Sequence, residues 1–201
     1  MTSIFINDHI YDFDLDEALL QLSDQRREVA LKYKHELGQR TCAAAYVLLC
    51  EGLREVYGIA EKPIFEYGEH GKPSIVGHPD IHFNLSHCKE AVICAISDHP
   101  VGVDVELVRR YNESLARHVM NDEEMETIQQ AERPEVMFTR LWTMKEAVVK
   151  RSGRGIADDI KHVLENESKV VTIEGPDLRY VYSIACSSKA ELRRLNIKII
   201  K

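Results

Sequence analysis

The sequence predicts an α+β fold of two similar halves, each a small antiparallel sheet packed on one long helix. Helical patterns with a buried apolar side cover residues 39–57 and 134–151, at equivalent places in the two halves of the 201-residue chain. Short apolar runs separated by turn residues surround both helices, as is typical of strands. The halves do not align as a sequence repeat. The placement of the helices alone therefore suggests a pseudo-dimer with halves at 1–100 and 101–201.

Helices dominate the first part of the chain, after a short apolar strand at 4–6. Asp14 with Glu17 three residues later has the spacing of a capping box. Ser23 is a suitable cap for a second, basic helix. The long third helix ends at Gly58, a residue type common just after helices.

Three strand-like segments follow in the middle of the chain. Residues 81–87 run from a strand into a loop, 91–96 are continuously apolar, and 101–107 alternate apolar and polar residues. Because a turn at 98–100 separates the last two segments, we expect residues 91–107 to form a hairpin.

Asp104 and Glu106 lie two residues apart in the alternating strand 101–107. Residues at this spacing point to the same face, with Cα atoms roughly 6.5–7 Å apart. Both carboxylates can therefore reach one hard cation. Taken alone, these seven residues are explained equally by a solvated acidic strand face, which is the more common situation.

The C-terminal half begins with helices. Asn121 and Glu124 predict a capped acidic helix to about Ala131, and Pro134 suits the first position of the long helix that follows. Short apolar runs at 170–173, 180–185 and 197–200 then predict a small antiparallel sheet.

Composition excludes several classes of function. The net charge of −7 argues against bulk nucleic-acid binding, because the chain has no excess of Lys and Arg to neutralise phosphates. No apolar stretch has the length of a membrane span, and the N-terminal residues do not resemble a signal peptide. The five cysteines form no CxxC pair, which favours free thiols in a reducing compartment. We therefore expect a cytoplasmic protein.

Four motifs occur in order: Gly71–Pro73 (GKP), Asn84–His87 (NLSH), Gly102–Glu106 (GVDVE) and Trp142–Lys150 (WTMKEAVVK). Each alone has an ordinary explanation. Glu146 and Lys150 of the last motif, for example, fit an i,i+4 helix ion pair worth about 0.2–0.5 kcal/mol. In this order, however, the four motifs resemble the motif series of the 4'-phosphopantetheinyl transferases, and more specifically their two-half, surfactin-synthetase-activating type.

This resemblance implies transfer of the 4'-phosphopantetheine arm of coenzyme A to a serine of an apo acyl or peptidyl carrier protein, with release of adenosine 3',5'-bisphosphate. Such an enzyme is a holo-[acyl-carrier-protein] synthase serving fatty acid, polyketide or nonribosomal peptide synthesis. The resemblance also implies a monomer, in which half 1–100 contacts the nucleotide and half 101–201 carries the metal site and docks the carrier.

By the same resemblance, Asp104, Glu106 and Glu146 hold Mg²⁺, which prefers oxygen ligands and usually takes a few carboxylates plus phosphate and water. Lys150 contacts the pyrophosphate. Glu146 also deprotonates the incoming serine, although a metal-bound carboxylate is a poorer base. Lys145 supports the helix or the phosphates.

The remaining contacts to coenzyme A follow from the resemblance, and solvated surface charge is the alternative explanation for each cation. The expected contacts are Ser86 and His87 at the nucleotide end, Lys72 and Pro73 beside the adenine, and Arg26 (or Arg27 in its place) and Arg40 as the N-terminal basic contacts.

Two small departures from the family pattern are Cys88, where a serine or another small residue is common, and Val148, where many members carry an aromatic residue. Neither removes a metal or phosphate ligand. We expect the carrier to dock near the long second helix, at Arg151, Arg154, Ile156 and the segment that follows.

Two other functions remain open. One is an Mg²⁺-dependent pyrophosphate or nucleotide hydrolase, which would act on coenzyme A or a nucleotide without a carrier. The other is a non-catalytic carrier-binding module, which would bind carrier without requiring Mg²⁺. The complete set of three carboxylates and Lys150 favours the transferase.

Overall fold

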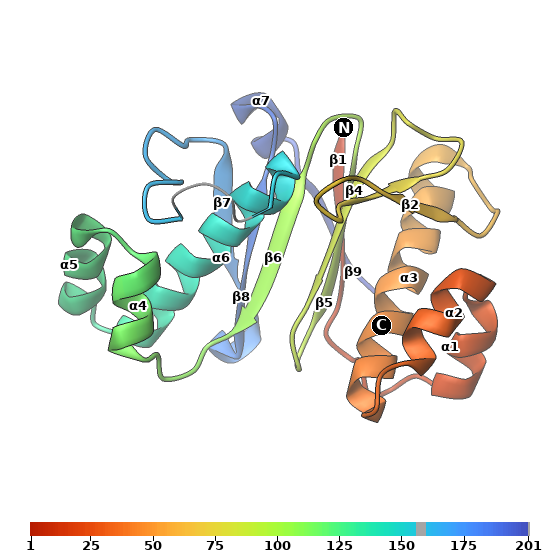
Figure 1. The fold of residues 1–201 in the computed structure, drawn as a ribbon, viewed down its shortest axis with the longest axis horizontal. Coiled ribbons are helices and arrows are strands. Elements are labelled where there is room, and N and C mark those ends of the chain that lie inside the picture. Colours follow the sequence, from red (N-terminus) through yellow and green to blue (C-terminus); the bar gives the residue numbers. More distant parts are fainter. Residues whose placement is uncertain (156–159, 201) are drawn as a thin grey trace.

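The structure is a computed structural model that describes residues 1–155 and 160–200. Two sheets lie side by side in the middle of the molecule, and each carries one long helix on its outer face (Figure 1). The first half of the chain contains β1 (Thr2–Asn7), α1 (Leu15–Gln21), α2 (Asp24–Leu31), α3 (Glu36–Tyr57), β2 (Phe65–Tyr67), β3 (Pro73–Ile75), β4 (His82–His87) and β5 (Val92–Ser97). The second half contains β6 (Gly102–Leu107), α4 (Glu113–Val119), α5 (Asp122–Gln130), α6 (Pro134–Ser152), β7 (Val170–Glu174), a 3₁₀ turn (Pro176–Leu178), β8 (Tyr180–Ala185), α7 (Lys189–Leu192) and β9 (Asn196–Ile199).

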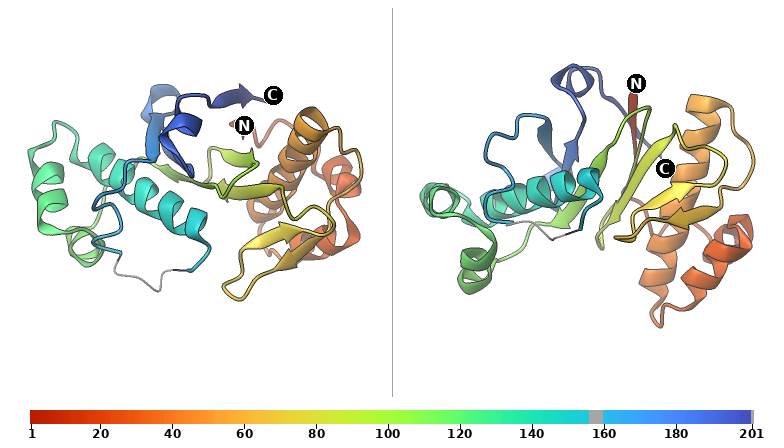
Figure 2. Two further views of the ribbon diagram at one scale, coloured as in Figure 1. Left: turned by 90° about the horizontal axis from the view of Figure 1, so that it is seen from above. Right: turned by 45° about the horizontal axis from the view of Figure 1, so that its top comes forward.

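The strand order is β4-β5-β1-β9 in the first sheet and β6-β8-β7 in the second, and β2 and β3 form a separate hairpin. Every pair is antiparallel except β1 with β9, which is parallel. The predicted α+β fold is confirmed. The prediction that 197–200 joins 170–173 and 180–185 in one antiparallel sheet is wrong, because β9 adds to the first sheet, parallel to β1. In Figure 2, helices α1 to α3 lie at one end of the molecule, and α4 and α5 lie at the other.

The predicted hairpin over 91–107 is wrong. Strand β5 pairs with β4 on one edge and β1 on the other, so neither edge is available to β6. Strand β6 instead pairs with β8, where Asp104 lies opposite Ser183. The turn at 98–100 therefore carries the chain from one sheet to the other.

The two sheets share one apolar core. Residues of β1 and β5, such as Ile4 and Ile93, pack in the same cluster as Val103 and Val105 of β6. Because alternate residues of a strand face opposite ways, the apolar side of β6 enters this core while Asp104 points elsewhere. The shared core fixes β1 and β5 of the first sheet against β6 of the second.

Gly102 allows α6 to approach β6 closely. A Cβ atom at this position would lie 2.0 Å from the Ala147 carbonyl oxygen and 2.4 Å from the Arg151 nitrogen, both on the backbone of α6. Only glycine fits there, because real Cβ contacts are never so short. The motif glycine therefore sets the distance between the helix and the strand that carries Asp104.

Several predicted helix ends agree with the observed caps, although α3 begins at Glu36, three residues before its predicted start. Asn121 and Glu124 form a complete capping box, Ser23 caps α2, and Gly58 ends α3 in the left-handed conformation. Helix α4 and the β2–β3 hairpin were not predicted.

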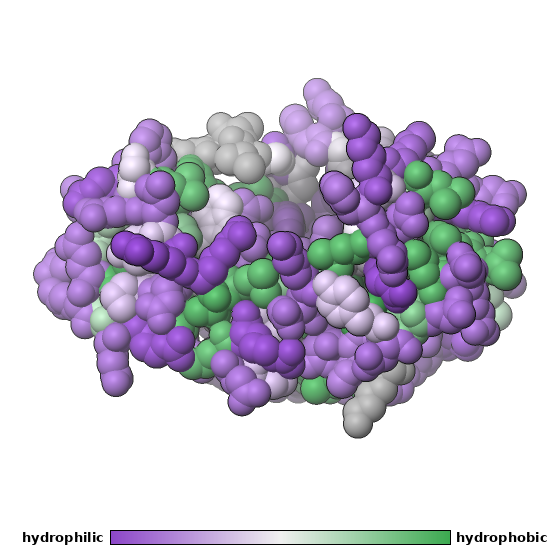
Figure 3. Space-filling model, turned by 90° about the horizontal axis from the view of Figure 1, so that it is seen from below, coloured by the Kyte–Doolittle hydropathy of each residue, from purple (hydrophilic) through white to green (hydrophobic). Residues whose placement is uncertain are grey.

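Within the described residues, no helix is both long and apolar enough to cross a membrane. The face shown in Figure 3 is mainly hydrophilic, with hydrophobic side chains scattered among charged ones, as on ordinary protein surfaces.

Candidate active site

A cavity of about 370 Å³ lies where β4, β6 and α6 meet. Three of the four motifs contribute to it, and they come from both sheets and from the helix on the second sheet. Its lining residues are Leu85, Ser86, His87, Asp104, Glu106, Trp142, Glu146 and Lys150. The structure thus brings together the predicted carboxylates, Lys150, Ser86 and His87.

Asp104 lies at the centre of the polar contacts in this cavity. It is 3% exposed, and its Oδ1 accepts hydrogen bonds from Ser86 Oγ at 3.0 Å and from Lys150 Nζ at 2.5 Å. Its Oδ2 is buried and has no hydrogen-bond partner in the described part of the chain. A buried, unpartnered carboxylate oxygen costs free energy, so this atom favours a cation.

Side chains of β4 hold β6 in place. Asn84 Oδ1 accepts the Val103 N–H at 2.8 Å, and Ser86 Oγ accepts the Val105 N–H at 3.3 Å. The two strands belong to different sheets, so these side chains replace the backbone pairing that neighbouring strands of one sheet would have. The backbone is anchored on both sides of Asp104.

The surroundings of the other two carboxylates, Glu106 and Glu146, disfavour their charged forms. Burial, and after it the charge of Asp104, raises the pKa of both Glu106 and Glu146. Lys150 opposes the shift at both sites. The surroundings thus disfavour the ionised forms of Glu106 and Glu146, and a bound cation would favour them.

These shifts predict the pH dependence of stability in the metal-free protein. A carboxyl whose folded pKa is raised binds more protons in the folded state, so stability falls as pH rises above about 4.3. Glu106→Gln and Glu146→Gln should each stabilise the metal-free protein by about 0.5–1 kcal/mol at pH 7.5. The gain should disappear near pH 3, below the ordinary glutamate pKa of about 4.3, where the carboxyls are protonated in both the folded and the unfolded state. Thermal denaturation in EDTA at the two pH values measures this, and equal gains at both would contradict it.

The donor set fits Mg²⁺, although the three carboxylates do not form a preassembled cluster. Across residues 1–155 and 160–200, no group of three His, Cys, Asp or Glu side chains is arranged to hold a metal ion. Mg²⁺ does not require such a group, because it is commonly bound by one or two carboxylates plus substrate phosphates and water. The unpartnered Asp104 Oδ2, beside Glu106 and Glu146, suits this kind of binding.

Lys72 connects the first half of the chain to the end of α6. Its Nζ donates to the carbonyl oxygens of Lys150 at 2.7 Å, Arg151 at 2.9 Å and Val101 at 3.2 Å. Burial, together with the charge of Arg151, lowers the pKa of Lys72 to about 8. A lysine at a helix C-terminus also stabilises the helix dipole. All three donors of Lys72 are thus used within the protein.

A second cavity of about 260 Å³ adjoins the first and shares Glu146 and Lys150 with it. Lys72 and Pro73 line it, as do Gly153 and Gly155 beyond α6. The Gly71–Pro73 motif is therefore next to the site, with the lysine ammonium engaged by backbone carbonyls.

The two predicted N-terminal cations differ in position. Burial lowers the pKa of His87, and the charges of Lys150 and Arg26 lower it further, which places Arg26 within electrostatic reach of the cavity. Arg40 instead donates to Glu36 at 2.7 Å and to the Phe13 carbonyl at 2.8 Å. It lines neither of the two cavities. Arg26 lines neither cavity either, and its guanidinium lies over the Phe65 ring at 5.9 Å, but its charge acts on His87, whereas Arg40 is engaged by Glu36 and Phe13.

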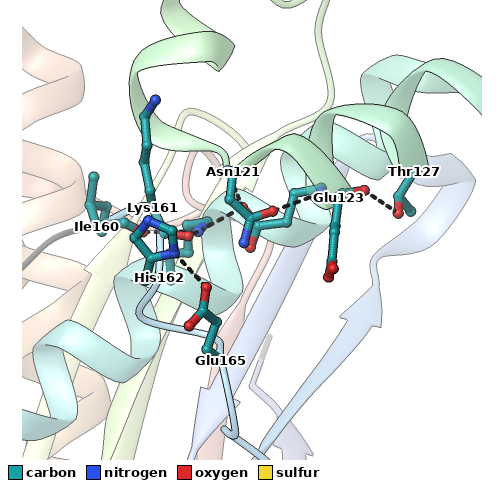
Figure 4. Close-up of polar contacts among 9 residues, drawn as sticks. Asn121, Glu123, Thr127, Ile160, Lys161, His162 and Glu165 are labelled. Carbon is teal, nitrogen blue, oxygen red and sulfur yellow. Dashed lines mark hydrogen bonds and ion pairs between the residues drawn. The ribbon is translucent and has the colours of Figure 1, made fainter.

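Lys145 is fully buried and does not line the cavity. Its Nζ donates to the carbonyl oxygens of Ile160 and Lys161, each at 2.9 Å, and pairs with Glu124 Oε2 at 2.8 Å. Figure 4 shows His162 of the same segment turned toward Glu165. Lys145 therefore ties the segment after α6 to α5, which agrees with its predicted supporting role.

The residues proposed for carrier docking have different surroundings. Arg151 donates to the Cys186 carbonyl at 2.7 Å and to Glu167 at 2.6 Å, so its guanidinium is engaged internally. Arg154 is exposed, and Ile156 lies outside the described residues. Of the two departures, Val148 is buried against Ala185 and Cys88 is half-buried.

A third cavity, of about 420 Å³, was not predicted. It adjoins the first and shares Glu106 and Trp142 with it. Tyr111 and Phe138 stack in its wall with ring centroids 5.0 Å apart, and Arg109 and Arg110 line it as well. The adjacent arginines directly after the acidic strand were the available sequence signal, but only the unpredicted helix α4 closes the cavity.

Comparison with known proteins agrees with the motifs. A family described as the 4'-phosphopantetheinyl transferase superfamily matches residues 100–194. The 4'-phosphopantetheinyl transferase psf-1 of Bacillus pumilus is 34% identical over 139 residues, which cover 68% of this chain and 60% of that protein. The transferase gsp of Aneurinibacillus migulanus is 29% identical over 91% of this chain and 81% of its own length. The transferase Sfp of Bacillus subtilis (strain 168) is 29% identical over 84% of this chain and 81% of its own length.

Proposed function

The chain belongs to the 4'-phosphopantetheinyl transferase superfamily, and we propose that it transfers the 4'-phosphopantetheine arm of coenzyme A to a serine of an apo acyl or peptidyl carrier protein. The observation that carries this proposal is the convergence of Asp104, Glu106, Glu146 and Lys150 in one cavity beside Ser86 and His87. A pyrophosphate needs positive charge around its oxygens, which Lys150 supplies directly and a cation held by the carboxylates would supply as well.

In this proposal Asp104, Glu106 and Glu146 hold Mg²⁺. When bound, the metal would supply positive charge to the pyrophosphate. Lys150 contacts the pyrophosphate oxygens and stabilises the charge that develops as the phosphorus–oxygen bond breaks. Glu146, whose pKa is raised, accepts the proton of the carrier serine.

The nucleotide end of coenzyme A is proposed to lie on the N-terminal side of the cavity. Arg26 supplies positive charge and His87 a hydrogen bond to its 3'-phosphate, and Pro73 lies beside the adenine in the second cavity. Arg40 would have to leave Glu36 and Phe13 to contribute, so we give it a structural role instead.

We propose that the protein acts as a monomer in the cytoplasm, because a single chain can form the whole cavity. Residues 1–100 supply β4 to the cavity, and residues 101–201 supply β6 and α6. One chain thus provides both walls. The third cavity, with Arg109 and the stacked Tyr111 and Phe138, suits an acidic carrier better than the internally engaged Arg151.

The test is incubation of the protein with coenzyme A, Mg²⁺ and an apo carrier, followed by intact mass measurement of the carrier. We expect a gain of one phosphopantetheine arm, which Asp104→Asn should abolish while the protein stays folded. Turnover of coenzyme A without carrier would support the hydrolase instead. Carrier binding without Mg²⁺ and without a mass gain would support the binding module.

A further inference from the structure

We propose that Ser86 is a positioning residue that orients the Asp104 carboxylate for the cation, and that it does not contact the nucleotide. The inference rests on the proposed function, since the cation is the Mg²⁺ described there. It changes the role expected for Ser86 from the motif resemblance.

The hydrogen bonds of Ser86 have only one consistent assignment. Its Oγ lies 3.3 Å from the Val105 nitrogen, 3.2 Å from Lys150 Nζ and 3.0 Å from Asp104 Oδ1. The backbone N–H and the ammonium can only donate, and an ionised carboxylate can only accept. The hydroxyl therefore accepts two hydrogen bonds and gives its single proton to Asp104.

This assignment uses the full capacity of the hydroxyl, which is one donor and two acceptor positions. Ser86 is also 7% exposed, so little of it is open to a ligand. A nucleotide phosphate has oxygens that require donors, and the only proton of Ser86 is already used. The geometry thus assigns the side chain to Asp104.

The contacts also determine where Asp104 lies. Asn84 holds the preceding residue, Val103, and Ser86 holds the following residue, Val105. With Oδ1 occupied by Ser86 and Lys150, Oδ2 is the oxygen without a partner. Ser86 therefore both holds β6 against β4 and orients the Asp104 carboxylate.

Groups that hydrogen-bond to a metal ligand typically contribute 10–100-fold to metal affinity. Ser86→Ala should therefore raise the half-saturating Mg²⁺ concentration about 10–100-fold. Trp142 reports this directly, because it is the only tryptophan in the chain and it lines the cavity. Its fluorescence is followed during a Mg²⁺ titration, and Mn²⁺ binding is measured separately by electron paramagnetic resonance.

Three controls separate positioning from other roles. Coenzyme A binding by Ser86→Ala, measured by calorimetry in EDTA, should equal that of the parent. Ser86→Thr keeps the hydroxyl and should restore Mg²⁺ affinity. Ser97→Ala removes another buried strand serine, paired with Thr2 at 2.9 Å, and should leave Mg²⁺ affinity unchanged.

Unchanged Mg²⁺ affinity in Ser86→Ala, with weaker coenzyme A binding in EDTA, would overturn the inference in favour of a nucleotide contact. An equal loss of Mg²⁺ affinity in Ser97→Ala would overturn it in favour of general destabilisation. A parent protein without any Mg²⁺ response would contradict both the proposed function and the inference. Normal Mg²⁺ binding in Ser86→Ala contradicts the inference alone.

Discussion

Glu146→Gln is expected to lower the rate of transfer by about 10³-fold, because removal of one charged group that stabilises a transition state typically costs 10²–10³-fold. Glutamine keeps the size and shape of the side chain but loses the charge that would bind Mg²⁺ and the base that would accept the serine proton. The same substitution should stabilise the metal-free fold at neutral pH, since it removes a carboxylate whose pKa burial has raised. Loss of activity with a gain in stability is typical of a functional site and not of a structural residue.

Glu135→Gln is the matched control for this variant. Glu135 lies on the same helix, eleven residues or about three turns before Glu146, and pairs with Arg133 outside the cavity. Its substitution should leave the transfer rate within about twofold of the parent, as expected for an exposed ion pair. Both rates are measured by the mass gain of the carrier. If Glu146→Gln transferred the arm at the parental rate, the proposed metal and base roles of Glu146 would be wrong.

Lys145→Met is expected to destabilise the protein by about 3–5 kcal/mol, the usual cost of breaking a buried ion pair. The substitution removes the cation between Glu124 and the carbonyl oxygens of Ile160 and Lys161. For a chain of this size, such a loss lowers the melting temperature by roughly 10 °C. Urea and thermal denaturation measure the effect.

A second substitution shows whether the cost comes from the unpaired charge. Glu124→Gln removes the charge but keeps an acceptor for the Asn121 N–H, so the capping box of α5 remains. The double variant Lys145→Met with Glu124→Gln should therefore be more stable than Lys145→Met alone. A double variant no more stable than Lys145→Met would show that the unpaired charge of Glu124 is not the source of the cost.

Local features of the fold were predictable from the sequence, because caps and periodicity act over a few residues. The capping box of Asn121, the end of α3 at Gly58 and the shared face of Asp104 and Glu106 all follow from spacing. The order of the motifs predicted the family, and the comparisons confirm it.

Features that depend on contacts between distant segments were not predictable. The 91–107 hairpin failed because β5 already has two neighbours, and spacing along the chain says nothing about occupied edges. For the same reason the sequence did not show that Lys72 binds backbone carbonyls of α6, or that Arg40 binds Phe13 and Glu36. A lysine or arginine in a motif can thus look free to bind a ligand although its N–H groups already bind other parts of the protein.

The parallel pairing of β1 with β9 has a consequence for folding. It joins Ser3 to Asn196, so the first sheet gains its last strand only after nearly the whole chain has been synthesised. Contacts between such distant segments form slowly, because a very long loop must close first. On the ribosome, the outer edge of β1 stays uncovered until residues 196–199 have emerged. The cavity does not wait for this pairing, because its lining residues lie on β4, β6 and α6, which all precede β9 in the chain.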